Sequence, residues 1–300
     1  MYSAYDAPLS QKIQSLIAAF GIISFVIIFI TGLFSFLYKK HRTNYICMWS
    51  MLISESIMFW QVQNMAVQHR MILNLPIFIC FILLFSFWSS SISKRFISRT
   101  IIVGCVLLQL FNFAKAFAPF LPVSGKFQIF AERYYPFQRN DLDALRQLDT
   151  KLNSLTSGTN DYVYVAASGW FLNDSILQCI DAPATDRAVP NMFNSNHIDL
   201  RDGFPTDFLQ ARYVVTTTPI QTHLTSGQEV ITYLSDSVQN SSNYLGIHFQ
   251  KIYQIELDNH VVAEVYEKVS DFTQDDLSKL RAYFCTLYPD SPELFADRIQ

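Results

Sequence analysis

IQSLIAAFGIISFVIIFITGLFSFLY, residues 13–38, is an uncharged run of 26 residues that is dense in Ile, Phe and Leu. A helix needs about 20 apolar residues to cross the hydrocarbon core of a bilayer. The run is too long for the apolar core of a secretory signal peptide, and no small-residue cleavage site precedes the basic residues that begin at Lys39. The sequence therefore predicts a first membrane-spanning helix over 13–38.

Three further apolar stretches follow in the first 120 residues. They predict spans over about 44–66, 71–93 and 100–118. The first of these carries Glu55 at its middle among polar neighbours, so we expect it to pack inside a bundle. The last is short and reaches spanning length if Lys115 extends its side chain to the headgroups. The sequence therefore predicts about four transmembrane α-helices.

The charged residues divide the chain into two parts of opposite sign. Residues 1–120 carry nine Lys/Arg and two acidic residues, a net charge of +7, whereas residues 121–300 carry thirteen and twenty-three, a net charge of −10. We expect a transmembrane region over 1–120 and a separate domain over 121–300, which is long enough to bury its own core. The acidic balance of that domain, which has no cationic stripe, argues against nucleic acid as a partner.

The Lys/Arg residues of the short loops predict the orientation, because cytoplasmic loops carry an excess of them. Six lie in one set of loops: Lys39, Lys40, Arg42, Lys94, Arg95 and Arg99. Only Lys12 and Arg70 lie in the opposite set before the last span. We therefore expect a multi-pass protein of the plasma membrane whose N-terminus and C-terminal domain lie outside the cytoplasm. So short an outer N-terminus is typical of a fragment whose further transmembrane helices belong to a parent or partner protein.

Residues 121–300 alternate helical and strand patterns, which predicts an extracytoplasmic α/β domain with a mixed sheet. After an exit segment over 121–139, helices are expected over 142–152 with Asn140 as cap, 174–180, 228–238, and from Thr273 to about 288. Strands are expected over Tyr162–Ala167, apolar on both faces as in a covered parallel sheet, and Tyr213–Thr217. Phe249–Leu257 and Val261–Tyr266 predict a C-terminal β-hairpin with Asn259 in its turn. The polar stretch Asp181–Phe204 predicts a loop.

The five cysteines show no CxxC spacing of the kind that binds a metal. Cys179 and Cys285, both in the predicted outer domain, could form one disulfide. Free thiols are the favoured alternative.

Two stretches of the second part resemble a known group of proteins. ARYVVTTTPIQTHL at Ala211–Leu224 and FQKIYQIELDNHVVAEVYEK at Phe249–Lys268 resemble the extracytoplasmic C-terminal domain of bacterial multispanning membrane proteins related to the GT-C class of glycosyltransferases. The resemblance covers roughly residues 70–270 and rests on structural motifs, a YVV strand followed by a proline and a hairpin that ends in YEK.

The resemblance implies a role in cell-envelope polysaccharide or teichoic-acid glycosylation, with a polyprenyl-phosphate-linked sugar as donor and an acceptor outside the membrane. Such enzymes carry their key acidic residues in a long outer loop between early spans. This chain departs from that pattern, since Tyr2–Gln11, with the single acid Asp6, is all that stands in that place. Catalysis would then depend on spans upstream of this chain.

Glu55 and Asp6 are the weak candidates for catalytic residues. An acidic side chain at mid-membrane is costly to insert and is by default a functional hypothesis. The alternative for Glu55 is a protonated or hydrogen-bonded carboxyl that packs against a neighbouring helix.

Four polar residues in the predicted loop are candidates for substrate binding: His197, Asp199, Arg201 and Asp202. Arg201 suits a phosphate or carboxylate, although an ordinary solvated loop with internal ion pairs is the simpler interpretation. Asp141-Leu142-Asp143 matches the DxD of metal-dependent sugar transferases, but acidic residues are common at a helix N-terminus, and we predict no metal site.

The chain carries no phosphate-binding glycine loop, GxSxG or HExxH, and only nine glycines, so we predict no cofactor and no ATP- or NAD-dependent enzyme. Two functions remain. The first is the C-terminal part of a polytopic membrane glycosyltransferase of hexosyltransferase type, inactive alone if its catalytic spans lie upstream. The alternative is a non-catalytic, membrane-anchored protein whose outer domain binds an envelope polymer or a partner protein.

Overall fold

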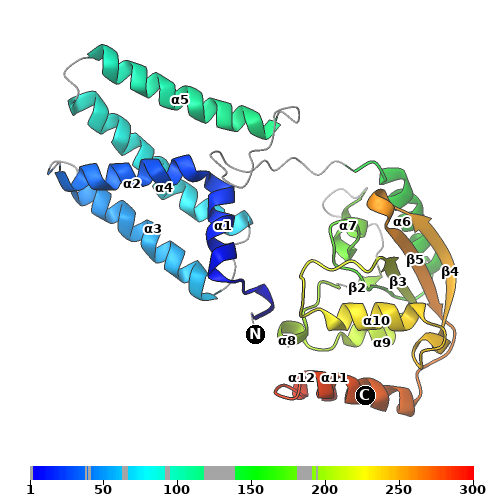
Figure 1. Cartoon of the computed structure of the whole chain (residues 1–300). Helices are drawn as coiled ribbons and strands as arrows, with labels where there is room; N and C mark the ends of the chain where they lie inside the picture. Colours follow the sequence, from blue (N-terminus) through cyan, green and yellow to red (C-terminus); the bar gives the residue numbers. More distant parts are fainter. Residues whose placement is uncertain are drawn as a thin grey trace. The chain divides into compact units, whose positions relative to one another are not determined.

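The computed structural model describes residues 3–37, 39, 42–62, 67–91, 95–117, 139–180, 191–193 and 195–300 (Figure 1). Tyr5–Phe137 make up one compact unit, and Gln138–Gln300 together with Met1–Ala4 make up the other. The predicted exit segment lies outside the described residues except for its last residue, Arg139.

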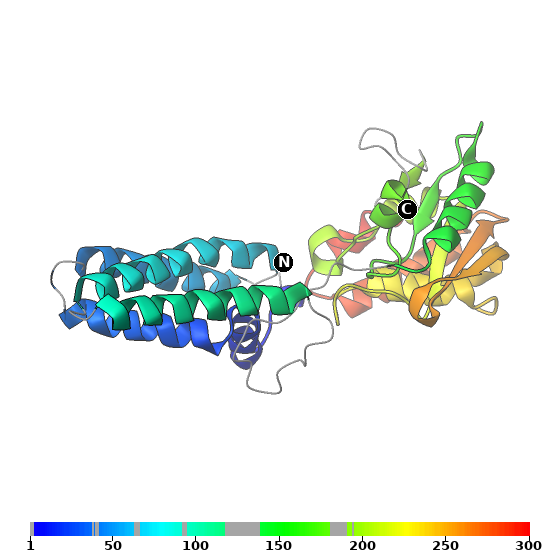
Figure 2. The same ribbon diagram turned by 90° about the horizontal axis from the view of Figure 1, so that it is seen from above.

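The first unit is helical. After the short 3-10 turn η1 (Ser3–Tyr5), its elements are α1 (Leu9–Phe20), α2 (Ile22–Leu37), α3 (Arg42–Val62), α4 (Val67–Ser91) and α5 (Arg95–Phe117). α4 packs against α2, α3 and α5, and Figure 2 shows α2 to α5 side by side in blue to green. Helices therefore occupy each of the four stretches for which the sequence predicts one.

The prediction of one continuous helix over 13–38 is wrong, because the chain bends sharply within it. α1 ends at Phe20 and α2 begins at Ile22, and the two helices meet at an angle of 89°. Gly21 lies between them with a φ of +73° and donates its N–H to the Ile17 carbonyl at 2.8 Å. A positive φ at glycine is a common way to end a helix, and it redirects the chain here.

Within the described residues no single helix combines the length and the apolar character needed to cross a bilayer. The bent pair of Leu9–Phe20 and Ile22–Ile30 meets both requirements when its two helices are taken together. The four predicted spans therefore stay a prediction.

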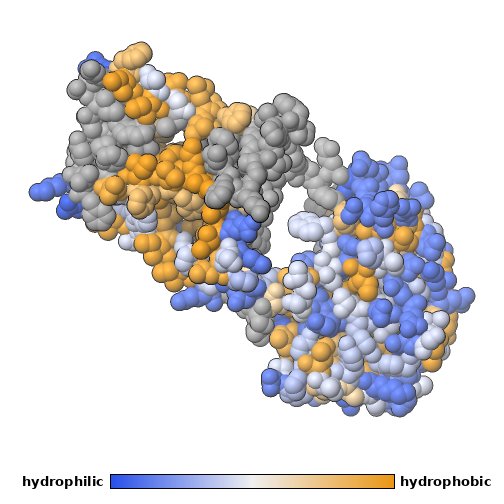
Figure 3. Space-filling model, in the orientation of Figure 1, coloured by the Kyte–Doolittle hydropathy of each residue, from blue (hydrophilic) through white to orange (hydrophobic). Residues whose placement is uncertain are grey.

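The helical unit leaves much of its apolar surface uncovered. Its buried cluster is small and includes Leu73, Ile77 and Cys80. By contrast, Phe29 is 66% exposed, Phe78 63% and Leu107 59%. Figure 3 shows this surface as an orange region over the helices, whereas the second unit is mostly blue and white.

The second unit contains a five-stranded sheet among its described residues, in the order β2-β1-β3-β5-β4. The strands are β1 (Val163–Val165), β2 (Met192–Phe193), β3 (Tyr213–Thr218), β4 (Phe249–Glu256) and β5 (Val262–Lys268). β1 pairs in parallel with β2 and β3, whereas β5 pairs antiparallel with β3 and β4. The sheet is thus mixed and ends in the predicted hairpin, and Asn259 in the hairpin turn has the positive φ of 59°.

Helices cover both faces of this sheet (Figure 1). The helices of the unit are α6 (Leu142–Thr156), α7 (Asp174–Cys179), α8 (Asp199–Asp202), α9 (Thr206–Gln210), α10 (Glu229–Gln239), α11 (Gln274–Leu287) and α12 (Glu293–Ala296), with short 3-10 turns at η3 (Gly246–His248) and η4 (Asp258–His260). Val163 and Val165 belong to the apolar cluster under α6 and α7. Tyr164, between them, belongs to the cluster under α9, α10 and α11. The strand predicted to be apolar on both faces is therefore covered on both faces.

Two predicted helix caps have different outcomes. Thr273 caps α11 as predicted, in a capping box with Asp276. Asn140 is not the cap of α6, because Asp141 takes that position. The Asp141 carboxylate makes no cap bond; it pairs with Arg139 at 2.7 Å and accepts the Asp258 N–H at 2.9 Å.

The polar stretch Asp181–Phe204 is not wholly a loop. Its residues 181–190 and 194 lie outside the described residues, but Met192–Phe193 form the parallel edge strand β2 and Asp199–Asp202 form α8. Elements this short carry too little periodicity to be recognised in a sequence.

Candidate ligand-binding site

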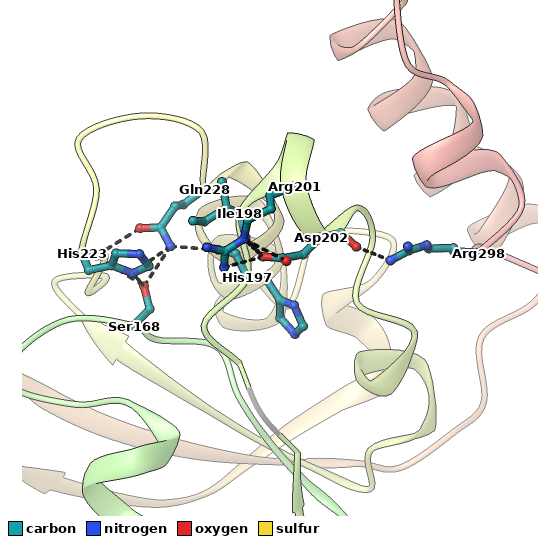
Figure 4. Close-up of polar contacts among 8 residues, drawn as sticks. All are labelled: Ser168, His197, Ile198, Arg201, Asp202, His223, Gln228 and Arg298. Carbon is teal, nitrogen blue, oxygen red and sulfur yellow. Dashed lines mark hydrogen bonds and ion pairs between the residues drawn. The ribbon is translucent and has the colours of Figure 1, made fainter. Parts of the chain in front are cut away.

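The carboxyl ends of the parallel strands meet at one edge of the sheet. From β1 the chain runs through α7 to β2 on one side, and it then continues to β3 on the other side of β1. The strand order reverses between β1 and β3, and open α/β sheets bind ligands at such a point, beyond the carboxyl ends of the strands. Ser168 follows β1, His197 follows β2, and His223 and Gln228 follow β3 (Figure 4).

Gln228 connects the loops that leave all three strands. Its amide nitrogen donates to Ser168 Oγ at 3.0 Å and to the His197 carbonyl at 2.9 Å. Its amide oxygen accepts the backbone N–H groups of His223 at 3.0 Å and Leu224 at 2.9 Å. The side chain is buried, so these four bonds satisfy a polar group that would otherwise be costly to bury.

Ser168 and His223 form a hydroxyl–imidazole pair at the centre of this edge. Ser168 Oγ lies 3.0 Å from His223 Nδ1 and also accepts the Gln228 amide and, at 3.3 Å, the His223 N–H. Since both acceptor positions of the hydroxyl are used, its proton is left for Nδ1, and the ring proton then sits on Nε2. Partial burial, and next the charge of Arg201, lower the pKa of His223, which favours this neutral ring. Ser168 is buried, so the pair fixes the loops and leaves the imidazole at the surface.

Arg201 and Arg298 bring two guanidinium groups to the neighbouring segment. Arg201 Nη2 pairs with the Asp202 carboxylate at 3.0 Å, and its side chain is 33% exposed. Asp202 also accepts the Ile198 N–H at 2.9 Å, which fixes α8. Arg298, from the C-terminal segment, donates to the Asp202 backbone carbonyl (Figure 4). Guanidinium groups held in this way are suited to phosphate or carboxylate oxygens.

Asp199 lies at the N-terminus of α10. It is fully buried, and its carboxylate accepts the first N–H groups of α10, those of Glu229 at 2.9 Å and Val230 at 2.8 Å. The Tyr288 hydroxyl donates to Asp199 and lies 2.5 Å from Glu229 Oε2. Burial, and next the Glu229 carboxyl, raise the pKa of Asp199 to about 7. The carboxylate therefore acts as a cap supplied from a distant segment.

The structure thus places the four predicted loop residues in different surroundings. Arg201 and Asp202 lie together beside the Gln228 network, while Asp199 faces the N-terminus of α10. The His197 carbonyl belongs to the network, but its ring is turned away and stacks on Tyr164 with centroids 6.0 Å apart (Figure 4). The sequence interpretation missed Ser168, His223 and Gln228. The signal was present, because Ser168 and His223 closely follow the predicted buried strands.

The two candidates for catalytic residues, Asp6 and Glu55, lie in the helical unit and differ in their contacts. Asp6 pairs with Lys12 at 2.6 Å, a contact that lowers the pKa of Asp6. Glu55 lies on α3, and one of its carboxylate oxygens is buried with no hydrogen-bond partner among the described residues.

The carboxylates of Asp141 and Asp143 pair with different arginines, Arg139 and Arg146. No group of three or more His, Cys, Asp or Glu residues in the described part of the chain is arranged to hold a metal. Cys179 and Cys285 are free thiols, so the alternative of a disulfide between them is wrong.

Known proteins give no identification. No family model matches the chain, and neither a curated protein nor a solved structure matches it. The resemblance to GT-C-related proteins stays a prediction.

Proposed function

We propose that the chain is anchored in a plasma membrane by its helical unit and that its α/β domain lies outside the cytoplasm, where it binds a phosphate-bearing saccharide of the cell envelope. That chemistry is common to a polyprenyl-phosphate-linked sugar and to a phosphate-containing envelope polymer. The uncovered apolar surface of the helices supports the anchor, since apolar patches of this kind suit a lipid or protein environment. The basic loops support the orientation.

The observation that carries the binding function is the arrangement at the carboxyl edge of β1 and β3. Gln228 holds the loops in place, so the exposed His223 ring and the partly exposed Arg201 are presented from a fixed frame. The His223 imidazole is a polar ring, and the neighbouring Arg201 carries a positive charge. Together these groups are complementary to an anion that also carries hydroxyl groups.

A binding role fits these residues better than a catalytic one. At this edge of the sheet the hydroxyl that has a histidine partner, Ser168, is buried, and both of its acceptor positions are occupied. Descent from a GT-C-related glycosyltransferase is the second proposal, and Glu55 is the observation that favours it. A buried carboxylate oxygen with no partner among the described residues suits a role in the membrane.

The test uses the full chain in lipid nanodiscs. Binding of two probes is measured by calorimetry: a polyprenyl-phosphate-linked hexose placed in the bilayer, and soluble poly(glycerol phosphate). We expect one of the two to bind, and Arg201→Gln to weaken it about tenfold or more, because a hydrogen bond to a charged group contributes about 1.5–3 kcal/mol.

The matched control is Arg146→Gln, which removes an exposed arginine of α6 whose ion pair is long, at 3.5 Å. It should bind as the unchanged chain does. Equal affinities for the Arg201 and Arg146 variants, or no binding of either probe to the unchanged chain, would contradict the proposal.

A further inference from the structure

A second surface of the α/β domain is lined by tyrosines. An open groove of about 620 Å³ lies between α10 and α11, with Tyr233, Tyr244, Tyr283 and Lys279 among its lining residues. We call it the tyrosine groove. None of its lining residues belongs to the Gln228 network, so it is a separate surface.

The rings of the groove are held in fixed positions by the core. Tyr233 and Tyr283 stack with their centroids 3.8 Å apart, and Tyr233 meets Phe284, which is fully buried, edge-on at 5.7 Å. The hydroxyls of Tyr233 and Tyr244 lie 3.0 Å apart and form a hydrogen bond. A preformed aromatic wall lowers the entropy cost of binding, because the side chains need no ordering when a ligand arrives.

The polar groups of the groove include tyrosine hydroxyls and one paired ammonium. Lys279 Nζ lies 5.8 Å from the centroid of the Tyr244 ring, and the ammonium pairs with Asp275 at 2.5 Å. Burial, and next the Tyr233 hydroxyl, raise the pKa of Tyr244, so this phenol stays protonated and can donate. The groove thus offers aromatic surface, hydroxyl groups and an ammonium whose charge is paired.

We propose that the tyrosine groove binds a neutral saccharide, with the C–H face of a pyranose ring against Tyr283 and its hydroxyls bonded to Lys279 and the tyrosine hydroxyls. The face of an aromatic ring is electronegative and attracts the weakly positive C–H groups of a sugar. The volume of about 620 Å³ falls in the range of small-molecule sites. An apolar protein segment fits less well, since it would cover the ammonium and the hydroxyls without offering them partners.

Tyr283 is the residue on which this inference depends most. Its side chain is 37% exposed, so it has surface left for a ligand after stacking on Tyr233. Only the source of the saccharide rests on the proposed function; the groove itself uses different residues. A saccharide that binds both surfaces would carry its phosphate at Arg201 and an uncharged unit at Tyr283.

The experiment is saturation-transfer NMR on the full chain in nanodiscs. The probes are methyl glycosides of glucose, galactose and N-acetylglucosamine, with a disaccharide of each. At least one probe should give a saturable signal. Tyr283→Ala should weaken it about tenfold, and Tyr283→Phe, which keeps the ring, should weaken it about threefold at most.

Two further variants keep the test decisive. Ala282→Trp fills the groove from the exposed face of α11 and should abolish binding even if Tyr283→Ala proves unstable. Tyr162→Ala is the matched control, because Tyr162 is also exposed, at 40%, and stacks on Phe193 with centroids 4.4 Å apart. It should leave binding unchanged.

The two proposals fail in different ways. Arg201→Gln should leave binding of the neutral probes intact, and Tyr283→Ala should leave binding of the phosphate probes intact. If no probe gives a saturable signal with the unchanged chain, or if the signal survives Ala282→Trp, the tyrosine groove is not a saccharide site.

Discussion

In the α/β domain the large apolar side chains Leu148, Val215 and Phe284 are completely buried, whereas in the helical unit Phe29 and Phe78 leave most of their surface uncovered. Phenylalanine occurs in both groups, but the surroundings of its side chain differ. Burial from water is the main force that stabilises a domain in solution. Helices that meet lipid have no such force between them, because lipid tails are as apolar as their side chains. The proposed location of the helical unit in a membrane would account for this contrast.

The largest expected difference between the units is in the cost of removing a phenylalanine. Phe284→Ala should lower the free energy of unfolding by about 3–5 kcal/mol, since it opens a cavity in a closed core. Phe78→Ala in α4 should cost less than about 1 kcal/mol, because most of that ring is uncovered. Urea unfolding of the full chain in nanodiscs measures both variants. Similar costs for the two would remove the contrast.

Adding a charge to an exposed side chain should disturb the helical unit more than the α/β domain. Phe78→Lys should oppose membrane insertion by about 2.5–3.5 kcal/mol, if the residue faces the middle of a bilayer. Val269→Lys, at a side chain of the α/β domain that is 49% exposed, should have no effect on insertion. The fraction of each variant that resists alkaline extraction from membranes gives the result. Full resistance of Phe78→Lys would place that side chain away from lipid.

A smaller effect is expected where the α/β domain buries polar groups instead of apolar ones. Tyr288→Phe removes the hydroxyl that donates to Asp199 and lies 2.5 Å from Glu229 Oε2, and it should lower the free energy of unfolding by about 1–3 kcal/mol. Tyr162→Phe, at an exposed ring, is the control and should change stability little. A loss no larger than that of the control would mean that the two carboxyls do not need this donor.

A dependence of stability on pH should also arise from Asp199. Its raised pKa, about 7, means that the folded chain binds a proton which the unfolded chain has already released above pH 4 or so. Stability should therefore fall as the pH rises from about 4 to about 7, by at most about 1.4 kcal/mol per pH unit. Asp199→Asn should remove the pH dependence that comes from Asp199. Burial also raises the pKa of Asp174, so the contribution of Asp174 to the pH dependence should remain. An unchanged slope in Asp199→Asn would contradict the assignment.

The sequence predicted the parts of the fold that depend on neighbouring residues. The buried strands β1 and β3, the hairpin turn at Asn259 and the cap at Thr273 each follow from a short local pattern. Gly21 was missed because apolar residues continue on both sides of it, so composition gives no sign of the bend.

The site was less predictable, because its contacts join distant segments. Gln228 bonds to Ser168, which lies 60 positions away in the chain. Asp199 caps a helix that begins thirty residues later, and nothing in the sequence around it marks that role. A polar residue just after a buried strand was the one usable indication, and it points to Ser168 and His223.

The central claim, that the α/β domain lies outside a membrane which the helical unit crosses, is tested most directly by cysteine labelling. Two single-cysteine chains are made, one that keeps the exposed Cys179 and one that carries Lys39→Cys in a predicted cytoplasmic loop. Intact bacterial cells that express them are treated with a maleimide that cannot cross membranes. The account predicts that Cys179 is labelled in intact cells and that position 39 is labelled only after the cells are permeabilised. Protection of Cys179 until permeabilisation would contradict it.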